Sequence, residues 1–148
     1  MRENDPVMSA STFAANAAPT PTSSAAYQPA VCNIGPEEIA RRRMTGHVGL
    51  LATLAVLAVL VLVHAPPLTR LMAILPAAGS ASGYLQAWLK FCAGFGSRGI
   101  FNFGPLGEST AVGDADARAR DRRRSRQIGL ASLAIGIVVG IIAVLLPV

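Results

Sequence analysis

The sequence contains few of the side chains that enzymes and metal sites use. Its only cysteines are Cys32 and Cys92, which lie 60 positions apart. Two thiolates cannot complete the four-ligand site of structural zinc, and they do not form the cysteine framework of a small secreted domain. The chain shows no nucleophile beside a base, no cluster of metal ligands and no phosphate-binding glycine loop. We therefore expect a protein that is not an enzyme and that holds no cofactor or metal.

Charged residues are also scarce, at 14% of the chain, and aromatic residues make up 5%, whereas 52% of the residues are apolar. A soluble protein of this size needs polar side chains over its surface. Here the polar residues gather in a few stretches and leave apolar runs at residues 47–63, 71–89 and 128–148. Runs of this length are typical of membrane spans. The sequence therefore predicts an all-α membrane protein with three transmembrane helices.

The segments between the spans differ in composition. Residues 1–31 are rich in Ala, Ser, Thr and Pro and lack the apolar core of a signal peptide, which predicts a flexible tail. Residues 32–104 are expected to form a helical hairpin, with a glycine-broken segment whose phenylalanines lie in the headgroup layer. Residues 105–127 are expected to form a basic cytoplasmic loop and helix. Residues 128–148, free of charge, are the clearest span.

The positive charge predicts the orientation of the chain in the membrane. The net charge is +5, and the arginines lie beside apolar runs without the interleaved aromatics of a nucleic-acid motif, so we expect lipid and no nucleic acid as a partner. With the N-terminus in the cytoplasm, the cytoplasmic segments hold twelve of the thirteen basic residues and only Arg70 lies outside. The positive-inside rule therefore predicts N-in, C-out.

Small residues recur at a spacing that suits close helix contacts. Gly79 and Gly83 in the second run, and Gly136 and Gly140 in the third, each form a small-xxx-small pair. We expect these four glycines to line contacts between helices. Basic residues near the spans are expected to contact lipid or an acidic partner, although topology control alone explains them equally well: Arg41, Arg42, Arg43, Arg122, Arg123, Arg124 and Arg126.

Other polar residues receive ordinary structural interpretations. Cys32 and Cys92 are both expected on the cytoplasmic face, where they are either a reactive thiol pair or, as we favour, two small interfacial residues. His47 and His64 lie too far apart on one helix to ligate opposite faces of one cofactor. Asp114 precedes a polar helix, and helix capping explains it better than a calcium loop does.

Part of the chain resembles a known family. The pattern Asn33-x-Gly35-x-x-Glu38-x-x-x-Arg42-x-x-x-Gly46 leads into an apolar helix, and Cys92, Phe95, Gly99 and Ile100 follow the second run. Residues 33–102 thereby resemble the small bacterial YgaP-type two-helix inner-membrane domain. The resemblance implies a hairpin with both ends in the cytoplasm, a place in the bacterial inner membrane, and a link to sulfur metabolism. The tail, Cys32 and the third helix are additions, and Ala93 replaces the proline that usually follows the cysteine.

Three functional hypotheses follow from these features. The first is a non-enzymatic accessory or structural subunit that packs against a larger membrane complex or against copies of itself, with the tail along a partner. The second is a sulfur-handling or redox-sensing protein that uses its cytoplasmic-face cysteines. The third, ranked last because no polar stripe lines a pore, is a small oligomeric channel or exporter.

Overall fold

The structure is a computed structural model that describes residues 26–147. It is mainly helical, and a small two-stranded sheet lies near one end. In chain order the elements are α2 (Pro36–Leu62), η1 (Pro67–Ala73), α3 (Ile74–Trp88), α4 (Ala93–Arg98), β1 (Ile100–Phe101), β2 (Thr110–Ala111) and α5 (Ala115–Leu145).

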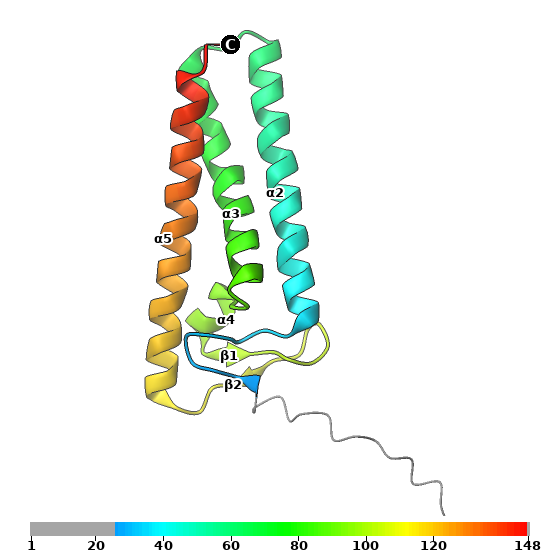
Figure 1. Cartoon of the computed structure of the whole chain (residues 1–148), viewed down its shortest axis with the longest axis vertical. Helices are drawn as coiled ribbons and strands as arrows, with labels where there is room; N and C mark the ends of the chain where they lie inside the picture. The colour runs from blue at the N-terminus through cyan, green and yellow to red at the C-terminus, as the bar shows by residue number, and fades with distance from the viewer. Residues whose placement is uncertain (1–25, 148) are drawn as a thin grey trace, which may run out of the picture.

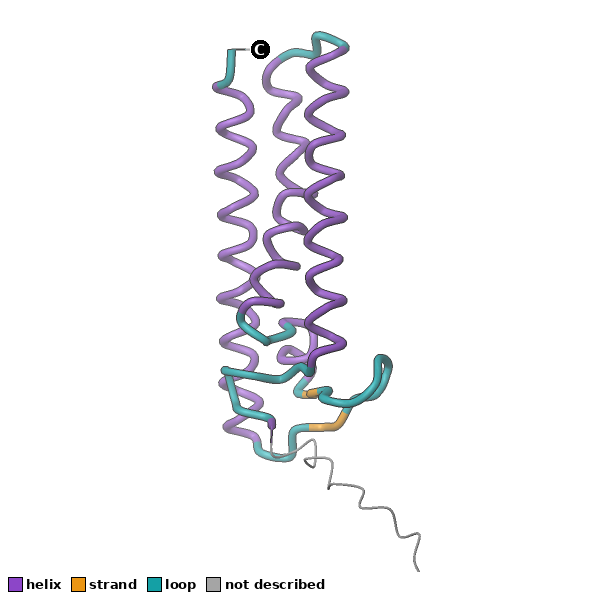
Figure 2. Tube along the Cα trace, turned by 45° about the vertical axis from the view of Figure 1, so that its right-hand side comes forward, coloured by secondary structure: helices purple, strands orange, loops and turns teal. Residues whose placement is uncertain are grey.

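The three long helices lie side by side, with α3 between α2 and α5 (Figures 1 and 2). α2 and α5 run in the same direction, from the end that carries α4 and the strands to the end that carries the C-terminus (Figure 1). α3 runs in the opposite direction. The central helix consequently holds the other two together.

The start of α2 follows from local sequence signals. Gly35 precedes the helix in an extended conformation, Pro36 occupies its first turn, and Glu37 and Glu38 complement the positive end of the helix. Glu38 pairs with Arg42, one helical turn further along, with 3.5 Å between the two side chains. At the other end of α2, His64 adopts a positive φ of 51° and the Pro-Pro pair then starts a new segment.

The predicted second span, residues 71–89, is divided in the structure. Its first residues belong to the 3₁₀-helix η1, and only Ile74–Trp88 form the α-helix α3. Pro76 explains the change, because it lacks an N–H and its ring would clash with the carbonyl of Met72 in a continuous α-helix. The chain therefore tightens before the proline and becomes α-helical after it.

α5 is one continuous helix of 31 residues, or about 46 Å at the usual rise. α5 runs without a break from the predicted basic segment, residues 105–127, into the predicted span, residues 128–148. The predicted cap is confirmed, since the Asp114 carboxylate accepts hydrogen bonds from the N–H groups of Asp116 and Ala117. The basic first half and the apolar second half therefore belong to one uninterrupted helix.

An end cap covers one end of the helices. We use this name for residues 26–35 and 91–114 together with the first turns of α5. Here β1 and β2 pair antiparallel, with Ile100 opposite Ala111, and Ile34 forms a bridge with Asn102. These short strands were not predicted. Residues 26–31, which we expected to belong to the tail, instead pack onto this layer, and residues 1–25 of the predicted tail lie outside the described residues.

Two phenylalanines of the predicted interfacial segment lie inside the protein. Phe91 is fully buried and Phe101 is 5% exposed, so the expectation that they contact lipid headgroups is wrong for both. Tyr27 stacks on Phe101 with 4.9 Å between the ring centres, and Phe103 packs beside them. These rings form the apolar centre of the end cap.

Two of the described helices, α2 and α5, are long and apolar enough to cross a membrane. Only 11% of the apolar stretch of α2 and 28% of that of α5 are buried inside the molecule. The buried residues of α2 are Glu38, Gly46 and Thr53, which mark a single narrow line of contact along the helix. Most large side chains along the apolar stretches of both helices are exposed.

Candidate functional site

α2 and α3 meet backbone to backbone. A Cβ on Gly83 would lie 2.7 Å from Gly46 Cα and would overlap the Gly46 nitrogen. A Cβ on Gly49 would lie 2.6 Å from the nitrogen of Ser80. The Ser80 hydroxyl donates a 2.9 Å hydrogen bond to the Gly46 carbonyl. Small residues on both helices thus allow an approach that any larger side chain would prevent.

α3 and α5 also meet through glycine. A Cβ on Gly136 would lie 2.7 Å from the carbonyl oxygen of Ile74 and 2.8 Å from the Ala78 side chain. A Cβ on Gly140 would overlap the Ile74 side chain, which has some freedom to move. The structure therefore places three of the four glycines singled out from the sequence, Gly83, Gly136 and Gly140, at contacts within the chain.

Gly79, the fourth glycine, occupies a different position. No atom lies within 4 Å of a Cβ built on it. Leu75, one helical turn before it on α3, is 78% exposed, and Met72, three residues earlier at the end of η1, is 67% exposed. The part of the chain that the structure describes therefore leaves this face of α3 uncovered, and the expected contact of Gly79 is not made within it.

Arg70 ties η1 to the end of α5. Its guanidinium is buried, with the residue 4% exposed, and Nη1 donates to the carbonyl oxygens of Ala143 and Leu146 at 3.0 and 2.9 Å. The last carbonyls of a helix have no intrahelical partner and carry partial negative charge. Arg70, on η1, thus supplies a hydrogen-bond donor to carbonyl groups at the C-terminus of α5.

Asn33 connects the two cysteine-containing segments. Its carboxamide oxygen accepts from the Cys92 N–H at 2.7 Å, and its Nδ2 donates to the Cys92 carbonyl at 3.1 Å. Its own backbone N–H donates to the Lys90 carbonyl and its carbonyl accepts from Asn102. Because Asn33 is fully buried, these hydrogen bonds satisfy polar groups of three segments that water does not reach.

The two thiols differ in accessibility. Cys92 is 1% exposed, and its Sγ accepts a hydrogen bond from the Phe95 N–H at the start of α4. Cys32 is half-buried, with its thiol 3.8 Å from the Ile34 carbonyl. Both cysteines are free. The structure brings their backbones together through Asn33 and leaves Cys32 as the more accessible thiol.

Most residues of the family-like motif lie in or beside the end cap. Gly35 faces the Phe103 backbone so closely that a Cβ on Gly35 would lie 3.0 Å from Phe103 Cα, and Gly99 ends α4 at a φ of 69° that favours glycine. Ile100 begins β1, and the Phe95 N–H bonds to Cys92 as described. Glu38 receives Arg41 and Arg42, and Gly46 lies two turns further along α2.

Asp121 is a buried residue that was not predicted to have a structural role. It is fully buried, and it accepts hydrogen bonds from the Tyr27 hydroxyl and the Ala30 N–H, both at 2.7 Å. Burial, together with the hydrogen bond to Asp121, raises the pKa of Tyr27 above its ordinary value. The carboxylate thus holds the segment before Asn33 against α5. The one sequence signal for this role was that an acidic residue stands within a run of arginines.

The basic residues predicted to contact lipid or a partner lie near the starts of α2 and α5. Arg41 and Arg42 pair with Glu38, at 3.4 and 3.5 Å. The other arginines of these clusters form no ion pair with any described residue, and most are exposed: Arg43, Arg122, Arg123, Arg124 and Arg126. Both clusters therefore present positive charge at the end of the molecule that carries the end cap (Figure 1).

Within residues 26–147, no group of three His, Cys, Asp or Glu side chains is placed to hold a metal ion. His47 bonds to Tyr84, and His64 lies in the turn after α2. No protein-family model, no curated protein sequence and no solved structure matches this chain. The function of the chain is therefore inferred from its own geometry.

Proposed function

We propose that this chain is a three-span integral membrane protein that serves as a non-enzymatic accessory or structural subunit. The supporting observation is the exposed apolar surface of α2 and α5, which water would not tolerate at this extent. Large apolar side chains exposed on α2 include Val48, Leu51, Leu54, Val59 and Leu62, and those on α5 include Leu130, Leu133, Val138, Ile142 and Leu145. Lipid is the solvent that suits this surface.

The parallel directions of α2 and α5 support a third crossing. If both helices cross in the same direction, the chain between them has to return through the bilayer. η1 and α3 run back between them, and their 22 residues together rise about 36 Å. This exceeds the roughly 30 Å thickness of the hydrocarbon core. We therefore assign the return crossing to η1 and α3.

The distribution of basic residues supports an N-in, C-out orientation. Apart from Arg70, the Lys and Arg residues of the described chain lie in the end cap, next to it, or in the first turns of α2 and α5. Arg70 lies near the opposite end, where it is bonded to the last turn of α5. By the positive-inside rule the end cap faces the cytoplasm.

The uncovered face of α3 supports the role of a subunit. Met72, Leu75 and Gly79 form an apolar face whose small residue allows another helix to approach closely. The partner is a helix of a larger membrane complex or a second copy of this chain. Gly79 is suited to this contact because, unlike Gly83, it is not used inside the molecule.

Gly79→Leu tests this proposal. Gly83→Leu is the matched comparison, because Gly83 already contacts α2 within the chain. Native membranes are crosslinked, solubilised in mild detergent, and the neighbours are identified by mass spectrometry. We expect Gly79→Leu to release the partner while the helicity and thermal unfolding of the chain stay unchanged. A wild-type chain that is monomeric and has no crosslinked neighbour, or a Gly79→Leu variant that keeps the same neighbours, would overturn the proposal.

A second candidate, sulfur handling or redox sensing, is favoured by the Asn33 bridge between the two cysteine-containing segments. Cys32 is the accessible thiol of the pair and would react first. Alkylation by a maleimide tests the idea. If both thiols react no faster than free cysteine, and Cys92→Ser leaves oxidant sensitivity unchanged, this candidate fails.

We further propose a place in the bacterial inner membrane, as the YgaP-type resemblance implies. The bonds between Asn33 and Cys92 support it, because these two residues belong to the opening and closing motifs of that domain and meet in the end cap. Immunodetection in fractionated cells, with the protein recovered from the outer membrane or from the soluble fraction, is the result that would contradict this placement.

A further inference from the structure

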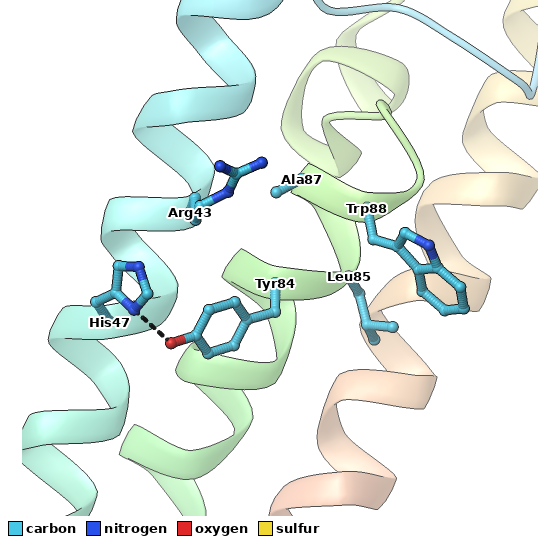
Figure 3. A pocket seen from close by; sticks show the side chains of 6 residues that line it. All are labelled: Arg43, His47, Tyr84, Leu85, Ala87 and Trp88. Atoms are coloured by element: carbon cyan, nitrogen blue, oxygen red, sulfur yellow. Dashed lines mark hydrogen bonds between the residues drawn. The ribbon is translucent and has the colours of Figure 1, made fainter.

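A groove opens between the beginning of α2 and the end of α3 (Figure 3). It measures about 460 Å³, within the range of small-molecule sites. Six residues line it: Arg43, His47, Tyr84, Leu85, Ala87 and Trp88. None of the roles assigned above uses this groove.

Four large side chains of the groove form two pairs, each spaced by one helical turn. Arg43 and His47 lie on α2, and Tyr84 and Trp88 lie on α3, with Tyr84 pointing toward His47 and Trp88 pointing away from α2 (Figure 3). The Tyr84 hydroxyl and His47 Nδ1 share a 2.6 Å hydrogen bond, and the two rings meet edge to face with 5.3 Å between their centres. This contact fixes the imidazole at the side of the groove.

Arg43 is the charged group that gives the groove its selectivity. Among residues 26–147 it forms no ion pair; Glu38, the nearest acidic residue on α2, lies five positions earlier and receives Arg41 and Arg42. Its guanidinium projects from α2 toward α3 over the groove (Figure 3). A fork of N–H donors with no acceptor among the described residues matches the oxygens of a phosphate.

The other wall of the groove is apolar. Leu85 and Ala87 contribute aliphatic surface, and Trp88 is 80% exposed, although its indole is among the largest apolar groups in the chain. Indole rings of this kind are enriched where a bilayer meets water. In the arrangement proposed above, on which this inference rests, the groove lies at the cytoplasmic interface, between the basic turn and the apolar stretch of α2.

We propose that this groove binds an anionic phospholipid, with the phosphate at Arg43 and the upper part of an acyl chain along Leu85 and Trp88. A free phosphate ion would leave the apolar wall unused. An apolar partner helix would leave the Arg43 guanidinium without an acceptor in a layer that already carries an excess of positive charge. A phospholipid supplies both an acceptor for Arg43 and an acyl chain for the apolar wall.

Trp88 is the only tryptophan in the chain, so its fluorescence reports on this groove. The full chain is reconstituted into vesicles of equal parts phosphatidylcholine and phosphatidylglycerol, with brominated acyl chains carried by one lipid or the other. We expect brominated phosphatidylglycerol to quench Trp88 with about a fivefold higher association constant, as one basic contact with acidic lipid supplies. Arg43→Gln should make the two quenching curves coincide.

Arg123→Gln is the matched control, since it removes one exposed charge from α5 at the same end of the molecule. It should preserve the preference for phosphatidylglycerol. Equal quenching by both lipids in the wild type, or a loss in Arg123→Gln as large as that in Arg43→Gln, would overturn the lipid site. Far-UV circular dichroism checks that both variants keep the wild-type helicity.

A second reporter separates this inference from the proposed function. In a Trp88→Phe background, Leu133→Trp places the fluorophore on the exposed face of α5. If this reporter is quenched while Trp88 in the wild type is not, protein covers the groove and only the lipid site fails. If neither is quenched by either lipid, the membrane placement itself fails.

Discussion

The helix contacts and the end cap of this molecule are held together in opposite ways. α3 meets α2 and α5 through glycine and serine, with backbone against backbone at Gly46 and Gly83. The end cap is built instead around buried polar side chains, above all Asn33 and Asp121, each of which bonds to distant segments. One region depends on the absence of side-chain volume and the other on the presence of particular polar atoms.

The difference follows from what each region does with its backbone. A helix satisfies its own N–H and C=O groups, so two helices in an apolar solvent gain most from close van der Waals contact. The loops of the end cap leave backbone groups without regular partners, and burying them requires side-chain donors and acceptors. We therefore expect added volume to break the first region and lost hydrogen bonds to break the second.

The largest effect is expected from Gly83→Leu. Its side chain would occupy the position of the Gly46 backbone, which cannot move without separating α2 from α3. We expect a loss of about 3 kcal/mol or more in the free energy of unfolding. Thermal unfolding in mild detergent, followed by circular dichroism, measures it. Gly79→Leu, which meets open space on the same helix, should unfold like the wild type.

A smaller but substantial effect is expected from Asn33→Ala. It removes two side-chain hydrogen bonds and leaves the buried N–H of Cys92 without a partner, whereas the Cys92 carbonyl keeps its bond from the Gly96 N–H; we expect a cost of about 2–4 kcal/mol. Cys92 should also react faster with a maleimide, since its segment loosens. Ser97→Ala removes an exposed hydrogen bond of the same end cap and should change neither measurement. Equal behaviour of the two variants would contradict the role of Asn33.

Tyr27→Phe is expected to have the smallest effect of the three. It removes one hydrogen bond to a carboxylate and should lower the free energy of unfolding by about 1.5–2 kcal/mol. Tyr84→Phe, the change at the other structured tyrosine, alters the groove between α2 and α3 and should leave the end cap intact. Limited proteolysis near residue 30 distinguishes them, because only Tyr27→Phe should expose that segment.

Alkaline pH offers an independent test of the Tyr27 contact. The pKa of Tyr27 is raised in the folded protein, so its contribution to stability is complete below the unfolded pKa of about 10 and declines as the pH rises toward the folded value. The wild type should therefore lose stability in strong alkali more steeply than Tyr27→Phe. Parallel pH profiles for the two proteins would show that the hydroxyl is not held by Asp121.

The helices could be predicted from the sequence because their signals are local. Pro36 and the following glutamates are residue types that favour a helix start, and Asp114 predicted the cap of α5. The division between η1 and α3 depends on Pro76, which the sequence showed but whose effect on the preceding turn was not anticipated. Helix positions therefore followed from propensity and capping, whereas helix continuity did not.

The contacts of the end cap could not be predicted because they join residues far apart in the chain. Asp121 lies 94 residues from Tyr27 and stands within a run of arginines, where an acidic residue normally faces water. Gly79 and Gly83 have the same spacing signal, and only the crossing of the helices decides which of them meets α2. Such choices belong to tertiary packing, which periodicity does not encode.

The most direct measurement is the sidedness of the chain in the membrane. A protease-cleavable tag is fused after the last residue, and a second tag is fused before the first, in sealed cells and in inverted vesicles. Three crossings by α2, by η1 with α3, and by α5 predict that the C-terminal tag is cleaved from outside intact cells and the N-terminal tag only in inverted vesicles. Cleavage of both tags from the same side would contradict the account.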